Sequence, residues 1–341
     1  MSETNLKLKT VEKGWKKLKK LSTIPIDLER VKLISNQSKD YLSDAANLES
    51  LILELGLNNE GIEEFPEKLY PSCGQGLRIW QYPIQFSKYL VGLSQLKITS
   101  YLELGIRHGG TFVATVEYLQ QFNSLEYALG VDIIPCPSVV EYSEMNPKAK
   151  FVRLNTQSDE FKQVLEEYQK FDLVLIDSFH DEVQCRKEFL SIKKYADIIA
   201  FHDISNINYP GVNQVWNEVK NLGEYDCYEY TDQYEEIEHS YMGIGVAVKK
   251  DRTAQRTNKL MIEQVKTLLE EVKGVPGLAQ TLQDSSNIIE DVQLDSLEMI
   301  NFMLKIEQDL KIEIDFEQLD FDYFQSIAKF TEFLSRMEVS N

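Results

Sequence analysis

The sequence lacks the long apolar run of a membrane span, has little cysteine, and carries far more acid than base. No apolar stretch approaches the roughly 18 residues that a spanning helix needs, and the first twenty residues lack the apolar core of a signal peptide. The four cysteines are scattered and form no Cys-x-x-Cys pair. A disulfide framework or a zinc site is therefore not expected, and we predict a cytoplasmic protein with reduced thiols.

The net charge of −19 argues against a surface that binds nucleic acid. A chain of 341 residues is long enough for two or three units with their own cores. Its lysine-rich beginning has apolar residues at helical spacing over Leu8–Leu21. This pattern predicts an amphipathic helix that covers the main domain or docks a protein partner, with a membrane surface as the alternative.

The pattern of apolar residues divides the chain into three parts. Residues 1–78 read as a helical extension with an amphipathic stretch over Ser38–Leu55 and a loop over Gly61–Gly76. A helix over Ile79–Leu96 opens the second part, residues 79–250. Residues 258–338 read as a small helical unit, and the charged stretch Lys249–Thr257 is the expected linker.

Strands and helices alternate from Thr99 onward, which indicates the α/β class and a Rossmann-like parallel sheet. Seven strands are predicted, at Ser100–Leu104, Tyr127–Val131, Lys150–Arg153, Leu173–Ile176, Ile198–Phe201, Asp226–Thr231 and Met242–Val248. Helices are predicted between them at Thr111–Phe122, Ser158–Tyr168 and Val183–Tyr195. The last two strands have no helix between them, so we expect an antiparallel hairpin at the edge of the sheet.

A glycine-rich turn follows the first strand and opens a helix. It reads Glu103-Leu-Gly105-Ile-Arg-His-Gly109-Gly110, and the second strand ends in Asp132. Glycines allow a tight turn and a close approach to a ligand, and an acid at the second strand suits ribose hydroxyls. The spacing Glu-x-Gly-x-x-x-Gly resembles class I S-adenosylmethionine-dependent methyltransferases, whereas a degenerate Rossmann domain without cofactor is the alternative.

The methyltransferase resemblance implies roles for individual residues. Glu103, Gly105 and Gly109 would surround the amino-acid end of S-adenosylmethionine, and Asp132 would hold the ribose. Asn155 in Asn155-Thr156-Gln157 would lie near adenine, and Asp177 would also face the cofactor.

Acids and histidines gather after the fourth and fifth strands. Asp177-Ser-Phe-His180 follows the fourth strand, and His202-Asp203 follows the fifth. Parallel strands end at one edge, so these side chains should converge. Asp177 and Asp203, with His202, have ligand atoms suited to Mg²⁺ or a similar divalent ion, and His180 titrates in the range of a general base. Hydrogen-bonded structural histidines are the alternative.

These two motifs resemble metal-dependent sugar and natural-product O-methyltransferases. In that group the acids after strands four and five bind the metal, and the histidine three residues beyond the first acid is the base. His202 stands where some members have a carboxylate.

The C-terminal part carries Asp295-Ser296-Leu297 at the start of a helix predicted over Ser296–Leu310. Asp295 and Glu298 form a capping-box pattern, which leaves Ser296 exposed at the helix start. Other helices are expected at Lys259–Val272 and Tyr323–Arg336, with a short turn near Phe316–Leu319.

This pattern resembles an acyl or peptidyl carrier protein of four helices. The resemblance implies that Ser296 carries 4′-phosphopantetheine. Gln293 stands where the family usually has glycine, and a simple capping serine is the alternative.

Taken together, these features predict an O-methyltransferase that acts on a hydroxyl of a carrier-tethered acyl group. Expected partners are a phosphopantetheinyl transferase and synthase components of polyketide or nonribosomal-peptide type, and a homo-oligomer is compatible with the sequence. One rival is a carrier and docking protein with an inert methyltransferase fold. Another is a methyltransferase acting on carbon or on a carboxylate.

Overall fold

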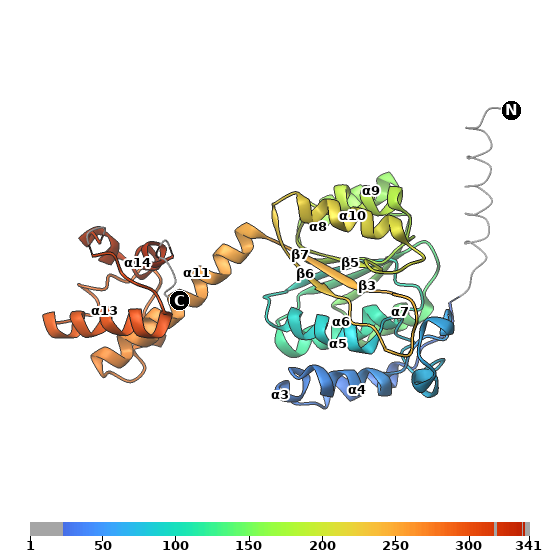
Figure 1. Ribbon diagram of the computed structural model, residues 1–341, viewed down its shortest axis with the longest axis horizontal. Helices are drawn as coiled ribbons and strands as arrows, with labels where there is room; N and C mark the ends of the chain where they lie inside the picture. The colour runs from blue at the N-terminus through green and yellow to red at the C-terminus, as the bar shows by residue number, and fades with distance from the viewer. Residues whose placement is uncertain (1–22, 317–318, 336, 338–341) are drawn as a thin grey trace. The chain divides into compact units, whose positions relative to one another are not determined.

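The computed structural model describes residues 23–316, 319–335 and 337, with only the backbone described for 251–259. The helix predicted over Leu8–Leu21 lies outside these ranges. None of the helices within them combines the length and apolar character of a membrane span. The chain divides into two compact units, Met1–Lys249 and Lys250–Asn341, each of which is described by itself (Figure 1).

The first unit is built on a seven-stranded sheet, as predicted. Its order is β3-β2-β1-β4-β5-β7-β6. The first five strands are parallel, and β7 pairs antiparallel with both β5 and β6. The bounds are β1 Ser100–Leu104, β2 Tyr127–Asp132, β3 Ala149–Arg153, β4 Phe171–Ile176, β5 Ala196–His202, β6 Tyr225–Tyr230 and β7 Ile244–Lys249. The expected terminal hairpin is therefore confirmed.

Helices cover both faces of the sheet (Figure 1). One face carries α5 (Pro83–Ser94), α6 (Gly110–Phe122) and α7 (Pro137–Met145), and the other carries α8 (Asp159–Tyr168), α9 (Glu182–Ile192) and α10 (Pro210–Asn221). Successive strand residues point to opposite faces, so Tyr101 joins one core and Leu102 and Leu104 join the other. Burial on both faces explains why β4, β5 and β7 read as nearly continuous apolar runs, whereas β3 and β6 at the two edges of the sheet are partly exposed.

Two of these helices were missed by the sequence analysis. Both α7 and α10 begin with a proline, which suits the first helical position because its missing N–H has no partner there. The buried residues Val212, Val215, Trp216 and Val219 of α10 have clear helical spacing. In α7 only Ser138, Val139 and Tyr142 are buried, so its pattern is much weaker.

The region before the sheet is more broken than predicted. It contains η1 Leu28–Arg30, α2 Val31–Ser35, α3 Lys39–Leu42, α4 Ala45–Leu55, and the 3-10 turns η2 Ile62–Glu64 and η3 Glu67–Ser72. The stretch Ser38–Leu55 is two helices, because Asp44 caps a new helix by accepting a hydrogen bond from the Asn47 amide. The helix expected from Ile79 begins only at Pro83, since the residue before a proline is extended.

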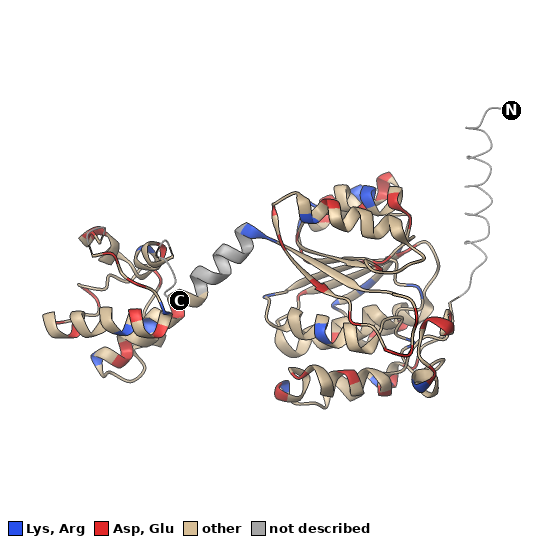
Figure 2. Ribbon diagram, viewed as in Figure 1, with Lys and Arg blue, Asp and Glu red and all other residues tan. Residues whose placement is uncertain are grey.

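The second unit is helical around one apolar core, and acidic residues lie on its helices (Figure 2). Its elements are α11 Lys250–Lys273, α12 Leu278–Thr281, α13 Ser296–Leu310, η4 Phe321–Gln325 and α14 Ile327–Leu334. The stretch predicted as a linker is instead the first part of α11. Ser326 interrupts the helix expected from Tyr323 by capping α14, and the turn expected near Phe316–Leu319 is only partly described. The residue extents 1–78, 79–250 and 258–338 stay predictions.

Candidate active site and carrier serine

A cavity of about 1140 Å³ lies at the carboxyl ends of the parallel strands. Strands β1 and β4 are neighbours here although β2 and β3 separate them in the chain, and such a switch point is where open α/β sheets bind ligands. All but one of the first unit's predicted site residues line the wall: Glu103, Gly105, Asp132, Asn155, Asp177, His180, His202 and Asp203.

Gly109 is the exception and is not among the wall residues. Its φ is +94°, and a Cβ there would lie 2.2 Å from Val139 Cγ2. The glycine is thus needed for the turn into α6 and for packing against α7.

Gly105 has a different reason to be glycine. Its φ is +90°, and a Cβ would lie 2.1 Å from the Asp177 carbonyl oxygen. The Asp177 amide donates to the Leu104 carbonyl at 2.9 Å, so the ends of β1 and β4 are held together beside it. This backbone contact leaves no room for a side chain at position 105.

Glu103 is fully buried at the end of β1. Burial raises the pKa of this carboxyl well above its usual range. The Tyr101 hydroxyl donates to Oε2, whereas Oε1 has no hydrogen-bond partner among the residues that the structure describes. A buried acceptor without a partner, on a cavity wall, is suited to a donor supplied by a ligand.

Asp132 ends β2 with both carboxylate oxygens held by backbone amides. The Arg107 amide donates to Oδ2 at 2.8 Å and the Ile134 amide to Oδ1 at 2.9 Å. Burial nevertheless raises the pKa of this carboxyl. After β3, Asn155 Oδ1 accepts from the Gln157 amide at 2.9 Å, which fixes the turn there.

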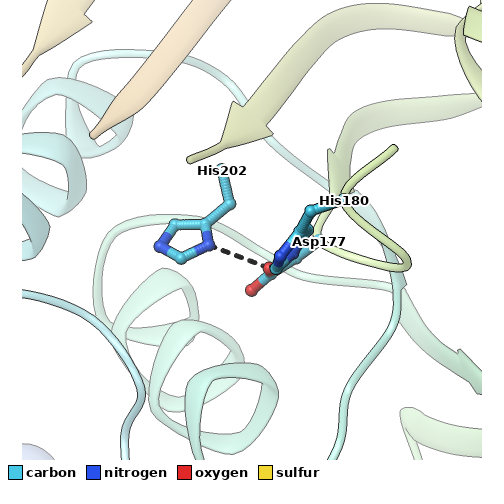
Figure 3. A group of neighbouring side chains, drawn as sticks. All are labelled: Asp177, His180 and His202. Carbon is cyan, nitrogen blue, oxygen red and sulfur yellow. Dashed lines mark hydrogen bonds and ion pairs between the residues drawn. The ribbon is translucent and has the colours of Figure 1, made fainter. Parts of the chain in front are cut away.

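The two acids and two histidines after β4 and β5 meet in one cluster, of which Figure 3 draws Asp177, His180 and His202. His180 lies between carboxylates, with Nε2 3.2 Å from Asp177 Oδ1 and Nδ1 2.9 Å from Asp203 Oδ2. His202 Nδ1 lies 2.9 Å from Asp177 Oδ1 and 3.5 Å from Asp203 Oδ2. Asp203 has a φ of +62°, and such a strained backbone in a non-glycine residue is common at functional sites.

The side chains that could share a metal ion differ from the predicted set. Ligand atoms of Asp177, His180 and His202 all lie within 4.8 Å of one another, and Asp203 is not in this group. His202 is 5% exposed, and its Nε2 has no hydrogen-bond partner in the described parts of the chain. Imidazole and carboxylate donors with an orphaned buried nitrogen fit a divalent ion at this place.

The charges in the cluster stabilise each other. Burial lowers the pKa of His180, but Asp203 and Asp177 outweigh it and raise that pKa to about 10. Burial opposes ionisation of Asp203, yet His202 and His180 hold its pKa below the ordinary value. Without a further cation His180 is therefore an imidazolium at neutral pH, and it accepts a proton only when those carboxylates are neutralised by another charge.

Ser296 is the first residue of α13 and is exposed. Asp295 Oδ1 accepts from the Leu297 and Glu298 amides at 2.8 Å each, and Glu298 Oε2 accepts from the Asp295 amide at 2.8 Å. This capping box fixes the backbone on both sides of the serine. It also leaves the serine hydroxyl at a helix N-terminus, where a phosphodiester is favoured.

Lys273 of α11 braces this helix start. Its Nζ lies 2.9 Å from Glu298 Oε2 and donates to the Gln293 carbonyl at 2.7 Å. Gln293, which stands at the usual glycine position, has a φ of +55°. The backbone thus adopts the left-handed conformation that glycine favours, although the residue is glutamine.

Two family models match the chain. Residues 72–205 match the model described as rhamnosyl O-methyltransferase/CmcI, and residues 263–334 match the model described as phosphopantetheine attachment site. The chain joins an S-adenosylmethionine-dependent methyltransferase to a carrier domain. Both resemblances expected from the sequence are confirmed by these matches.

Solved structures give weaker likenesses to the methyltransferase. An O-methyltransferase from Bacillus cereus, in complex with SAH, is 15% identical, with 64% of this chain and 96% of that chain covered and a TM-score of 0.38. A putative O-methyltransferase from Klebsiella pneumoniae is 14% identical, with coverage of 64% and 94% and a TM-score of 0.38. No curated protein sequence matches the chain significantly. The assignment rests on the family models.

The N-terminal extension of the methyltransferase contributes cavity residues that the sequence analysis missed. Glu60 Oε1 pairs with Arg107 Nη2 at 2.8 Å, and its Oε2 lies 3.2 Å from His108 Nε2. His108 Nδ1 accepts from the Ile24 amide at 3.0 Å. Two separate segments of the extension therefore hold the glycine-rich turn through hydrogen bonds and an ion pair.

Glu64 of η2 also lines the cavity. Burial and the charge of Asp203 raise the pKa of this carboxyl to about 7, partly offset by His202. Its only local signal is an acidic pair, Glu63-Glu64, in a stretch that reads as loop. The proximity of Glu64 to Asp203 could not be found from spacing, because more than a hundred residues separate Glu64 from Asp177 and Asp203.

Proposed function

We propose that the methyltransferase transfers a methyl group to a hydroxyl of an acyl group tethered to Ser296 by 4′-phosphopantetheine. The proposed extents of the two domains are 79–250 and 258–338. The observation that carries the proposal is the cluster of Asp177, His180 and Asp203 on the cavity wall, in a chain that also exposes a capped serine.

The proposed cofactor site uses the wall residues from β1, β2 and β3. Glu103 Oε1 is available for the amino group of S-adenosylmethionine, and Gly105 allows its approach. Asp132 has its oxygens oriented by backbone amides toward a ribose-binding role. Asn155 would contact adenine, and Asp177 would also face the cofactor.

The proposed reaction is an in-line displacement. A bond forms from the acceptor oxygen to the methyl carbon while the carbon–sulfur bond breaks, which releases S-adenosylhomocysteine. The hydroxyl proton passes to Nε2 of a neutral His180, whose Nδ1–H donates to Asp203. A divalent ion bound by Asp177, His202 and Asp203 would neutralise the carboxylates that otherwise keep His180 protonated, and it would supply positive charge that lowers the pKa of the hydroxyl.

The carrier half of the proposal concerns substrate delivery. A phosphopantetheinyl transferase would modify Ser296, and synthase components of polyketide or nonribosomal-peptide type would load the thiol as a thioester. A substrate tethered within the same chain reaches a high effective concentration at the site if the two can meet.

Intact-protein mass spectrometry tests both halves together. The full chain is incubated with a phosphopantetheinyl transferase, coenzyme A and candidate acyl donors, and then with S-adenosylmethionine. We expect the arm, then the acyl group, then one methyl to add in turn. Ser296→Ala should stop the first addition, whereas Ser285→Ala, at an exposed serine of the same unit, should not.

Two outcomes would favour the rivals. Failure of the wild-type chain to bind S-adenosylmethionine in calorimetry, with Ser296 still modified, would support an inert fold that serves as a docking scaffold. Methyl transfer that survives both a chelator and Asp177→Ala would point to methylation at carbon or a carboxylate. Equal rates on tethered and free acid would remove the role of the tether.

A further inference from the structure

A buried acid in α9 takes no part in the proposed chemistry. Glu188 is 1% exposed and is not on the cavity wall. Burial of an ionisable group costs free energy unless hydrogen-bond partners compensate for the lost water. The partners of Glu188 therefore indicate which parts of the structure it stabilises.

Its partners are all side chains of the cavity wall. Ser178 Oγ donates to the carboxylate and lies 2.8 Å from Oε1 and 2.6 Å from Oε2. Thr156 Oγ1 also donates to Oε1, and Gln184 Nε2 donates to Oε1 at 3.1 Å. Thr156, Ser178 and Gln184 line the cavity.

The two hydroxyls belong to loops that the sheet does not connect. Thr156 follows Asn155 in the loop after β3, and Ser178 follows Asp177 in the loop after β4. In the sheet order β3-β2-β1-β4, two strands lie between these loops. Strand pairing therefore does not fix the distance between the two loops. The Glu188 carboxylate connects them, because it accepts hydrogen bonds from both.

We propose that Glu188 is a positioning residue that holds the loops after β3 and β4 together around the adenosine part of the cofactor. Glu188 does not line the cavity itself and acts through its hydrogen bonds with Thr156 and Ser178, which do. The inference rests on the proposed cofactor site and adds the element that shapes its adenosine end. Loss of the carboxylate should weaken binding of the adenosine portion itself, because the hydrogen bonds of Glu188 go to Thr156, Ser178 and Gln184.

The test is calorimetric binding of two probes, S-adenosylhomocysteine and adenosine, to the full chain. In Glu188→Leu, which removes both acceptor oxygens, we expect about a tenfold loss of affinity for both probes, the size typical of losing hydrogen bonds to a charged group. Glu182→Leu is the matched control on the same helix, because Glu182 pairs with Arg186 outside the cavity. It should bind both probes like the wild type.

Thr156→Val supplies a second variant that removes only one donor. The double variant with Glu188→Leu should lose less than the two single losses combined, because both changes break the hydrogen bond between Thr156 and Glu188. Hydrogen exchange should also rise at 155–158 and 177–180 in Glu188→Leu but not in Glu182→Leu, which a general loss of stability would not reproduce.

The outcomes separate the two proposals. Wild-type affinity in a folded Glu188→Leu chain, or fully additive losses in the double variant, would overturn the role of Glu188 alone. If Glu188→Leu does not fold, wild-type binding by Thr156→Val would overturn it as well. Absence of S-adenosylhomocysteine binding by the wild-type chain would overturn the proposed cofactor site together with this role.

Discussion

Replacement of Gln293 by glycine should stabilise the carrier domain. The residue has a φ of +55°, and a left-handed conformation costs an L-residue roughly 1–2 kcal/mol. Glycine removes that cost but adds about 0.4–1 kcal/mol of entropy to the unfolded chain. The net gain in the free energy of unfolding should be roughly 0.5–1 kcal/mol. The Lys273 contact to the Gln293 carbonyl involves only the backbone of residue 293, so it is retained.

Hydrogen exchange of α13, followed by mass spectrometry in the full chain, measures this gain. The full chain also contains the methyltransferase, whose unfolding would contribute to any signal from the whole protein. Exchange measured within α13 reports the stability of the carrier domain alone. Protection should rise about two- to fivefold in Gln293→Gly. The matched control is Gln308→Gly, an exposed residue within α13. There the same substitution should cost roughly 0.5–1 kcal/mol, the ordinary penalty of glycine in a helix. Equal losses in both variants would refute the reasoning.

Three further changes have defined outcomes. Gly105→Ala should lower the free energy of unfolding by at least about 2 kcal/mol in urea titrations, because its Cβ would lie 2.1 Å from the Asp177 carbonyl. Gly223→Ala, at a φ of +71° with open space around it, should lose only the roughly 1–2 kcal/mol of backbone strain. Glu64→Gln should flatten the pH dependence of thermal stability, measured by tryptophan fluorescence in a chelator. The folded pKa of Glu64, about 7, is above its ordinary 4.5, so its contribution to stability falls as pH rises between these values. The exposed neighbour variant Glu63→Gln should keep the wild-type pH profile, and an unchanged profile in Glu64→Gln would contradict the assignment. Asp295→Ala should cost about 1 kcal/mol of α13 protection by loss of the helix cap, whereas Asp295→Asn, which keeps an acceptor oxygen, should lose less than half of that.

Local patterns were enough to predict the sheet and the start of α13. Strands β1, β4, β5 and β7 are buried on both faces, so their apolar composition reveals them, and the capping box is a four-residue signal. The helix α10 shows its spacing plainly and could have been predicted. By contrast, α7 buries only three residues, which leaves little periodicity to detect.

The chemistry of the candidate site was only partly predictable. Four residues follow predicted strand ends, and parallel topology brings such residues together, so their convergence could be predicted. They are Asp177, His180, His202 and Asp203. The placement of His180 between two carboxylates depends on the left-handed backbone of Asp203, which no local pattern indicates. Glu64 and Glu188 are brought near the site by tertiary packing, so the local sequence around them does not indicate this position.

The contact between Gly105 and the Asp177 carbonyl has a consequence for how this protein family would diverge. A glycine there is required by the fold itself, so natural selection would retain it even in a descendant that no longer transferred methyl groups. Glu103 and His202 are different, because each keeps a buried polar atom unpartnered within the described structure at the expense of stability. Once activity ceased to matter, substitutions at these two positions would stabilise the protein and should accumulate first. Acid at 103 and imidazole at 202 are therefore better markers of an active relative than the glycine motif.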